Sequence, residues 1–86
     1  MENNKIIKKL QERDNFMKIS ARNQLKGKVV KIQKGAVNSV VVLDIGGGNR
    51  ITSTITNAAV EELGLQEGVD AYALIKASNV MVGVDD

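Results

Sequence analysis

The sequence predicts a mainly β protein: a small five-stranded barrel with one short helix, plus an N-terminal helical extension. Its 86 residues are enough for one small domain with a modest core. From Lys18 onward, apolar and polar residues alternate in several stretches, which is the period of a strand. Glycines lie between these stretches and provide the turns that a β protein needs.

The extension comprises residues 1–16, and the predicted domain comprises residues 17–86. A helix is expected over about residues 3–13, because its large apolar residues would share one face and its charged residues the other. Those apolar residues are Ile6, Ile7 and Leu10. A helix this short is marginal unless it docks on another surface, so a mobile leader is an equally good interpretation.

The first two predicted strands supply most of the apolar surface. Around Lys28, strict alternation predicts two faces, one with Lys28, Val30 and Ile32, the other with Gly27, Val29 and Lys31. Residues 37–45 are the most apolar run and are rich in β-branched residues. Val40 and Val42 would face opposite to Val41 and Leu43, so both faces of this strand need cover. Another subunit is the simplest second cover for so small a domain.

Three consecutive glycines, residues 46–48, and Asn49 predict a hairpin turn into a third strand at residues 50–56. Triple glycines also occur in phosphate-binding loops. Here no Gly-Lys-Ser/Thr follows, and the next residues alternate as in a strand instead of opening a helix. A nucleotide site is therefore not expected at this turn.

A short helix is expected after the third strand, capped by Thr56 or Asn57, running to about Leu63 and stopped by Gly64. Residues 70–77 and 80–84 then alternate as a fourth and a fifth strand. Five strands with a helix between the third and the fourth is an order that suits a small OB-like barrel.

Composition narrows the function classes. The chain has no Cys and no His, which excludes disulfides, zinc–thiolate sites and the commonest acid–base group. A core with almost no aromatic residues gains little area per residue, and an obligate oligomer would relieve that shortage. Residues 19–86 carry equal numbers of acidic and basic side chains, with the basic ones concentrated early. A local positive region on a neutral body favours a small anion over a long phosphate backbone.

Two short segments carry the donors for such an anion. Ser20-Ala21-Arg22-Asn23-Gln24 combines a hydroxyl, a guanidinium and two amides, and Lys76-Ala77-Ser78 adds an ammonium and a second hydroxyl. Hydroxyls, backbone N–H groups and cationic side chains suit a tetrahedral oxyanion, whereas a carboxylate would repel it. Either segment alone would more often be a turn or a solvated strand end.

The order of the motifs along the chain resembles the molbindin (Mop) family of small molybdate- and tungstate-binding proteins. The resemblance runs from about Met17 to Val84 and rests on five segments: residues 20–24, 25–30, 49–53, 60–65 and 76–81. It implies an OB-like fold and a cytoplasmic protein for molybdate or tungstate storage. It further implies a homo-oligomer, a hexamer arranged as a trimer of dimers, whose oxyanion lies between subunits.

By that resemblance, the oxyanion-binding residues are Ser20, Ala21, Arg22, Asn23, Thr56, Asn57, Lys76, Ala77 and Ser78. Residues 20–23 of one chain would meet residues 76–78 of its neighbour. Thr56 and Asn57 could also lie near an oxyanion at the helix start, although simple capping is the more common role of such residues. Glu61 and Glu62 depart from the family's pattern, because regulatory relatives carry a basic residue late in this helix.

The bound ligand would be molybdate or tungstate itself, with no organic cofactor and no directly coordinated metal cation. No membrane partner is expected, since no apolar run is long enough for a membrane span or a signal-peptide core. Nucleic-acid binding by an OB-type barrel is one alternative, but it normally needs stacking aromatic residues that are scarce here. A purely structural interaction module is another. Enzyme activity is not expected, because no nucleophile–base pair or pair of carboxylates is apparent.

Overall fold

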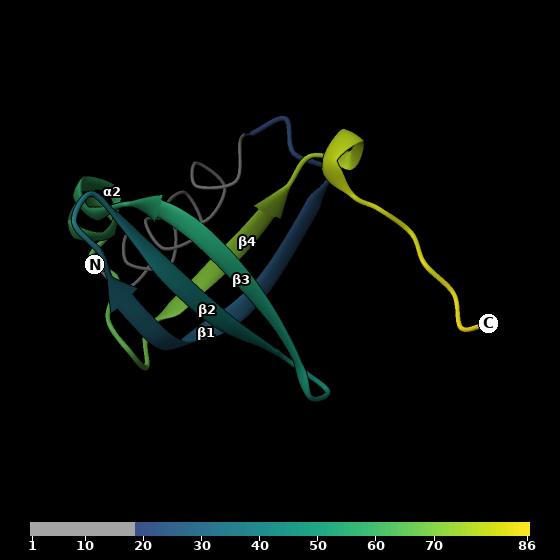
Figure 1. The fold of residues 1–86 in the computed structure, drawn as a ribbon, viewed down its shortest axis with the longest axis horizontal. Helices are drawn as coiled ribbons and strands as arrows, with labels where there is room; N and C mark the ends of the chain where they lie inside the picture. The colour runs from purple at the N-terminus through teal and green to yellow at the C-terminus, as the bar shows by residue number, and fades with distance from the viewer. Residues whose placement is uncertain (1–18) are drawn as a thin grey trace, which may run out of the picture.

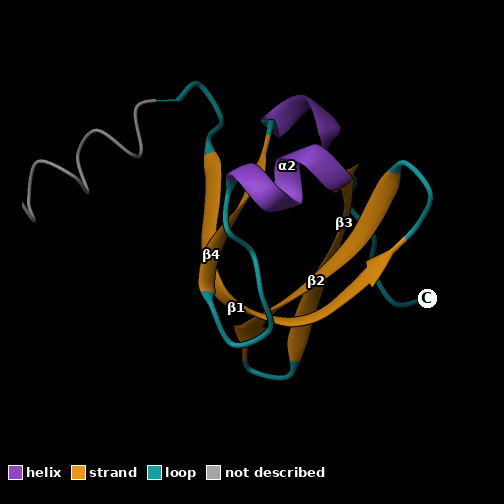
Figure 2. Cartoon of the chain, turned by 90° about the vertical axis from the view of Figure 1, so that its left-hand side faces the viewer, coloured by secondary structure: helices purple, strands orange, loops and turns teal. Residues whose placement is uncertain are grey.

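Residues 19–86, described by a computed structural model, form one curled antiparallel sheet with a short helix at one end (Figures 1 and 2). The predicted helix over about residues 3–13 lies outside the described residues. The elements are β1 (Asn23–Lys34), β2 (Asn38–Gly46), β3 (Asn49–Thr56), α2 (Asn57–Glu62), β4 (Asp70–Ile75) and the 3-10 turn η1 (Ala77–Asn79). The strand order is β3-β2-β1-β4, so β1 pairs with both β2 and β4.

The core lies on the inner face of this sheet and is small. Its buried apolar residues are Val29, Val41, Leu43 and Ala73, with half-buried Ile, Leu, Val and Ala side chains packed around them. Val40 and Val42 are half-buried on the outer face of β2. The prediction that this strand has apolar side chains on both faces is confirmed. Among residues 19–86, the short helix lies at one end of the sheet, and no other layer covers the outer face (Figure 2).

A β-bulge in β1 corrects the predicted alternation. Val29 pairs with Leu43 and Lys31 with Val42, so Val30 is an extra residue in this ladder. A bulge of this kind shifts all later residues of the strand to the opposite face. Ile32 therefore joins Val29 on the inner face, where it packs against the core. The prediction that Ile32 shares a face with Lys28 was wrong, because strict alternation assumes an uninterrupted ladder.

The predicted hairpin between β2 and β3 is confirmed. Gly46 pairs with Asn49, and both residues between them have positive φ, 64° for Gly47 and 80° for Gly48. Two left-handed central residues are the geometry of a type I′ turn, which glycine adopts without strain. The glycines of this turn therefore serve its backbone conformation. The alternating residues that follow them had predicted a hairpin and not a phosphate-binding loop.

The short helix α2 begins and ends as predicted. The Thr56 hydroxyl accepts a hydrogen bond from the Ala59 N–H at 3.0 Å, which is the bond of an N-cap. Gly64, with φ of 64°, follows the C-cap residue Leu63. Among residues 19–86, no helix is both long enough and apolar enough to cross a membrane.

The predicted fifth strand is not formed within the chain. After η1 the backbone leaves the sheet and runs outward to the C-terminus (Figure 1). Met81, Val82 and Val84 are 94%, 90% and 91% exposed. Their alternating pattern is that of a strand, but a strand needs a partner edge, and this segment pairs with no strand among the described residues. A mainly β fold with one short helix is thus confirmed, with four strands instead of five.

Candidate functional site

The two donor segments lie at the same end of the sheet. Asn23, the first residue of β1, is the register partner of Ile75, the last residue of β4. Because the two strands are antiparallel, the chain that enters β1 and the chain that leaves β4 emerge side by side. Residues 20–22 precede Asn23, and residues 76–78 follow Ile75. Figure 1 shows the segment before β1 reaching the sheet next to η1.

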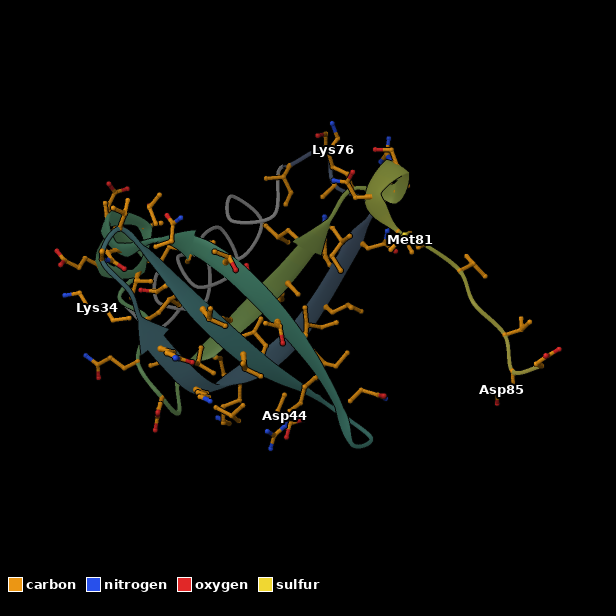
Figure 3. All side chains as sticks on the ribbon, in the orientation of Figure 1. Lys34, Asp44, Lys76, Met81 and Asp85 are labelled. Carbon is orange, nitrogen blue, oxygen red and sulfur yellow. The ribbon has the colours of Figure 1, made fainter. Side chains whose placement is uncertain are left out.

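These segments present donors to solvent. Ser20, Arg22, Lys76 and Ser78 are all exposed, and Figure 3 shows Lys76 at the outer end of the sheet. Lys76 has an extended backbone conformation and is the N-cap residue of η1. The N–H groups of Ala77 and Ser78 open this 3-10 turn and so have no acceptor within it. Hydroxyl, ammonium, guanidinium and main-chain donors therefore lie within a few residues of one rung of the ladder.

The charge that the described residues place at this end is positive. Residues 19–27 and 71–84 include Arg22, Lys26 and Lys76 but no acidic residue. The nearest acid along β4 is Asp70, at the far end of that strand, and its carboxylate pairs with Lys28. Among residues 19–86, no group of His, Cys, Asp or Glu could hold a metal cation. An anion is the charge that such a surface attracts.

Two side-chain amides next to the site, those of Asn23 and Gln24, donate hydrogen bonds to backbone carbonyl oxygens. Asn23 is half-buried, and its Nδ2 donates to the Ile75 carbonyl oxygen at 3.1 Å. Gln24 donates from Nε2 to the Ala21 carbonyl oxygen at 3.0 Å. The sequence placed Asn23 among the oxyanion donors; in one chain its amide donates a bond that joins β1 to β4, and a contact of Asn23 with the oxyanion stays a prediction. The bond from Gln24 to Ala21 was not predicted, because nothing in the sequence except the position of Gln24 next to Asn23 pointed to it.

Thr56 and Asn57 lie at the opposite end of β1. Thr56 pairs with Asn38 at the start of β2, close to the β1–β2 turn that follows Lys34. Since β1 has 12 residues, its two ends are separated by roughly 30 Å at the usual rise of a strand. Within one chain, these two residues therefore cannot contact the same oxyanion as Arg22 and Lys76.

The Asn57 side chain holds its end of the fold together. Its Oδ1 accepts a hydrogen bond from the buried Ser39 hydroxyl, and its Nδ2 donates to the Gly35 carbonyl oxygen at 3.0 Å. The Asn57 N–H also donates to the Val37 carbonyl oxygen at 2.8 Å. With Thr56 as the cap of α2, both residues have structural partners in one chain.

This fold and its cationic, donor-rich end define a class, that of small β-sheet domains with an anion-attracting surface. The family model of the TOBE domain matches residues 19–82. The chain is 65% identical over 69 residues to a probable molybdenum-pterin-binding protein of Haemophilus influenzae, a match over 80% of this chain and 100% of that protein. Molybdenum-pterin-binding protein 1 of Clostridium pasteurianum is 58% identical over 66 residues, 77% of this chain and 97% of that protein. The chain belongs to the TOBE-domain family, among its molybdenum-pterin-binding (molbindin) members.

Solved structures share the fold. MopII from Clostridium pasteurianum superimposes with a TM-score of 0.72 at 56% identity, over 77% of this chain and 98% of that one. The cytoplasmic molybdate-binding protein ModG, solved with molybdate bound, gives a TM-score of 0.75 at 54% identity, over 79% of this chain and 48% of that one. A molybdate-binding protein from Sporomusa ovata gives 0.74 at 38% identity, over 79% and 100% of the two chains.

Proposed function

We propose that this protein binds and stores molybdate or tungstate in the cytoplasm by donating hydrogen bonds to the oxyanion, without catalysing a reaction. The observation that carries the proposal is the meeting of residues 20–22 and 76–78 at one end of the β1–β4 ladder. The molybdate-bound relative ModG, matched at 54% identity, supports the choice of anion. A tetrahedral dianion of four oxygens needs many donors and no nearby carboxylate, which is the composition of this end.

The direct donors in this proposal are the Ser20 and Ser78 hydroxyls, the Arg22 guanidinium and the Lys76 ammonium. Main-chain N–H groups of residues 21–22 and 77–78 complete the shell, as in other backbone anion sites. The same donors discriminate against phosphate. A protonated phosphate carries an O–H group that needs an acceptor, and this group of donors offers none. Molybdate and tungstate have nearly the same size and charge, so both are expected to bind.

The site is proposed to be completed by another copy of the chain. In one chain its charged donors are exposed, and water competes strongly for an exposed anion. Apolar side chains near the same end are also exposed, Ile19 at 40%, Leu25 at 37% and Val80 at 47%. A neighbouring subunit would cover these side chains and exclude water from the oxyanion. ModG, for which a cooperative binding mechanism has been suggested, is consistent with communicating sites.

The open sheet and the C-terminal segment support the same assembly. Within residues 19–86, the strand order leaves β3 and β4 as edges, and residues 80–84 carry a strand pattern but pair with no strand. We propose that residues 80–84 of one copy add to an edge of another, which would supply the fifth strand of the barrel. A hexamer built as a trimer of dimers is the proposed final state. Thr56 and Asn57 would reach an oxyanion only if a different subunit brought it to their end of the sheet.

A calorimetric titration with molybdate and tungstate tests the function. Saturable binding of both, with much weaker binding of phosphate, is the expected result. No heat at millimolar molybdate would exclude the storage function. A nucleic-acid-binding barrel would instead show a salt-sensitive interaction with an oligonucleotide that molybdate does not displace.

Mixing two weakened variants tests which chain supplies each donor segment. Arg22→Ala chains and Lys76→Ala chains are unfolded together, refolded and titrated. If each site takes Arg22 from one chain and Lys76 from the next, random mixing restores wild-type affinity to about a quarter of the sites. If both residues come from one chain, as the β1–β4 register places them, no site is restored, and the neighbouring subunit supplies cover and not the second donor segment.

A further inference from the structure

The last rung of the β1–β4 ladder is fastened by a side chain. Asn23 and Ile75 are register partners, and the Asn23 Nδ2 donates to the Ile75 carbonyl oxygen at 3.1 Å. This bond crosses from β1 to β4 between residues 52 positions apart in the sequence. Asn23 is half-buried, whereas its neighbours Arg22 and Gln24 are exposed. The amide is therefore held in the fold while the residues beside it face solvent.

The position of this bond matters because both donor segments start one residue beyond it. Arg22 directly precedes Asn23, and Lys76 directly follows Ile75. Terminal rungs of a ladder open readily, since nothing beyond them holds the strands together. Here the Asn23 amide adds a side-chain bond at the rung where opening would move the two segments apart. The bond from Gln24 to Ala21 shapes the first segment alone and does not cross to the second.

We propose that Asn23 is a positioning residue that fixes the spacing between residues 20–22 and residues 76–78, and thereby sets the size selectivity of the oxyanion site. This inference rests on the proposed function, with both segments of one site taken from the same chain; sites restored by mixing Arg22→Ala and Lys76→Ala chains would overturn it. Donors held at a fixed spacing match an anion of one radius, because they cannot close on a smaller one. Without the Asn23 bond, the two segments would no longer be held at the spacing that fits the large anion, so its affinity would fall. They could then move closer together around a smaller anion.

Asn23 is uncharged, so its loss leaves the attraction of the site for any dianion intact. Arg22 and Lys76 differ in this respect, since removing either weakens the binding of all dianions alike. Selectivity among anions of equal charge and different size therefore separates positioning from electrostatic attraction. Sulfate, selenate and molybdate form such a series, in order of increasing size.

The experiment compares Asn23→Ala with wild type and with Asn38→Ala, a matched change at an exposed asparagine at the other end of the sheet. Affinities for sulfate, selenate and molybdate are measured by calorimetry and competition, with thermal unfolding of each ligand-free protein. In Asn23→Ala, molybdate affinity is expected to fall about five- to tenfold, the usual effect of losing one hydrogen bond. Sulfate affinity should stay within about twofold, because the charge of the site is unchanged. Asn38→Ala should leave all three affinities as in wild type.

The inference is overturned if affinity depends on anion size in Asn23→Ala as it does in wild type, or more steeply. A general loss of stability would lower all three affinities by the same factor, which leaves that dependence unchanged and so also counts against the inference. If Asn23→Ala does not fold, Asn23→Ser keeps a shorter donor and gives the same comparison, with the same outcome decisive. A wild-type protein that binds none of the three anions would sink the proposed function instead.

Discussion

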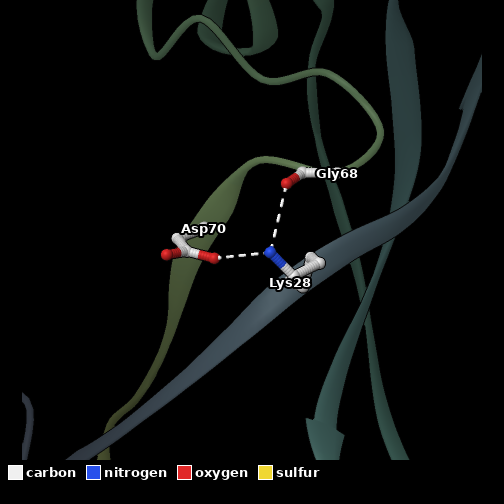
Figure 4. Close-up of polar contacts among 3 residues, drawn as sticks. All are labelled: Lys28, Gly68 and Asp70. Carbon is white, nitrogen blue, oxygen red and sulfur yellow. Dashed lines mark hydrogen bonds and ion pairs between the residues drawn. The ribbon is translucent and has the colours of Figure 1, made fainter.

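The Lys28 ammonium lies 3.0 Å from the Asp70 carboxylate and 3.3 Å from the Gly68 carbonyl oxygen, which joins the middle of β1 to the start of β4 (Figure 4). The two residues are also register partners on the outer face of the sheet. Both side chains are exposed, so water screens the pair, and its contribution to stability is modest. It helps to fix the register of the ladder whose far end carries the donor segments.

The hydrogen bond and the charge of Lys28 lower the pKa of Asp70 below its ordinary value of 3.8. A carboxyl group with a depressed pKa in the folded state stabilises the fold above its unfolded pKa and loses that effect as the pH falls through the folded pKa. Wild-type protein should therefore lose slightly more stability than Asp70→Asn as the pH falls from about 5 to below the ordinary pKa of an aspartate. Thermal unfolding across this range measures the difference. Asp85→Asn, in the exposed C-terminal segment, should follow wild type; equal acid sensitivity of wild type and Asp70→Asn would show that the pair is not formed in solution.

Arg22→Ala and Lys76→Ala should each weaken molybdate binding by about 10- to 100-fold, the usual cost of losing a hydrogen bond from a charged group. Lys31→Ala is the control, because Lys31 lies on the outer face opposite Val42, away from the donor segments. Calorimetric titration gives the three affinities. A similar loss in all three variants would point to diffuse electrostatic attraction and not to a defined site.

Gly27→Ala should destabilise the sheet by about 1–3 kcal/mol, the usual cost of overpacking. A Cβ at this position would lie 2.6 Å from the Asp44 carbonyl oxygen, and a backbone atom in a ladder cannot move aside cheaply. Lys34→Ala, at an exposed position of the same strand, should unfold at the wild-type denaturant concentration. Chemical denaturation of both variants checks the prediction, which fails if they unfold together.

Thr56→Ala should lower stability by about 1 kcal/mol through loss of the α2 cap, and Thr56→Ser should restore it. Molybdate affinity at the Arg22–Lys76 end should not change, since Thr56 lies at the other end of the sheet. Unfolding and titration are measured on the same samples. A reduced number of bound anions per chain in Thr56→Ala would instead reveal a second site at the start of α2.

Val82→Asp should shift the protein toward smaller species in analytical ultracentrifugation and weaken molybdate binding. The change places a charge in a segment that is proposed to pair with another copy, where an unpaired carboxylate is costly to bury. Val37→Asp is the matched control, because Val37 is a 69% exposed valine in the β1–β2 turn. An assembly that survives Val82→Asp unchanged would exclude this segment from the interface.

Most of the fold followed from local sequence signals. The triple glycine predicted the β2–β3 turn, and Thr56 and Gly64 predicted the two ends of α2, because these residues act on their own backbone. The bulge at Val30 did not follow, since it is a property of the pairing between β1 and β2 and leaves the sequence pattern nearly unchanged. The C-terminal segment was predicted as a strand from its alternation, but alternation does not identify the partner edge.

The site was predictable in its chemistry and less so in its geometry. Ser20, Arg22, Lys76 and Ser78 stand out as donors from the sequence alone. That their segments already emerge together from one chain depends on the β1–β4 register, which joins residues far apart in the sequence. Asn23 was predicted as a donor to the oxyanion. Its bond to Ile75 could not be foreseen, because a sequence does not tell which acceptor an amide will find.

Bringing together the two halves of the site at Asn23 and Ile75 also has a consequence for synthesis. β4 can pair with β1 only after both strands have left the ribosome. A chain that ends before residue 76 therefore carries only one of the two donor segments. Such long-range pairing costs more loop-closure entropy than the local β2–β3 hairpin does. Scarce oxyanion would thus be captured by finished molecules and not by fragments awaiting degradation.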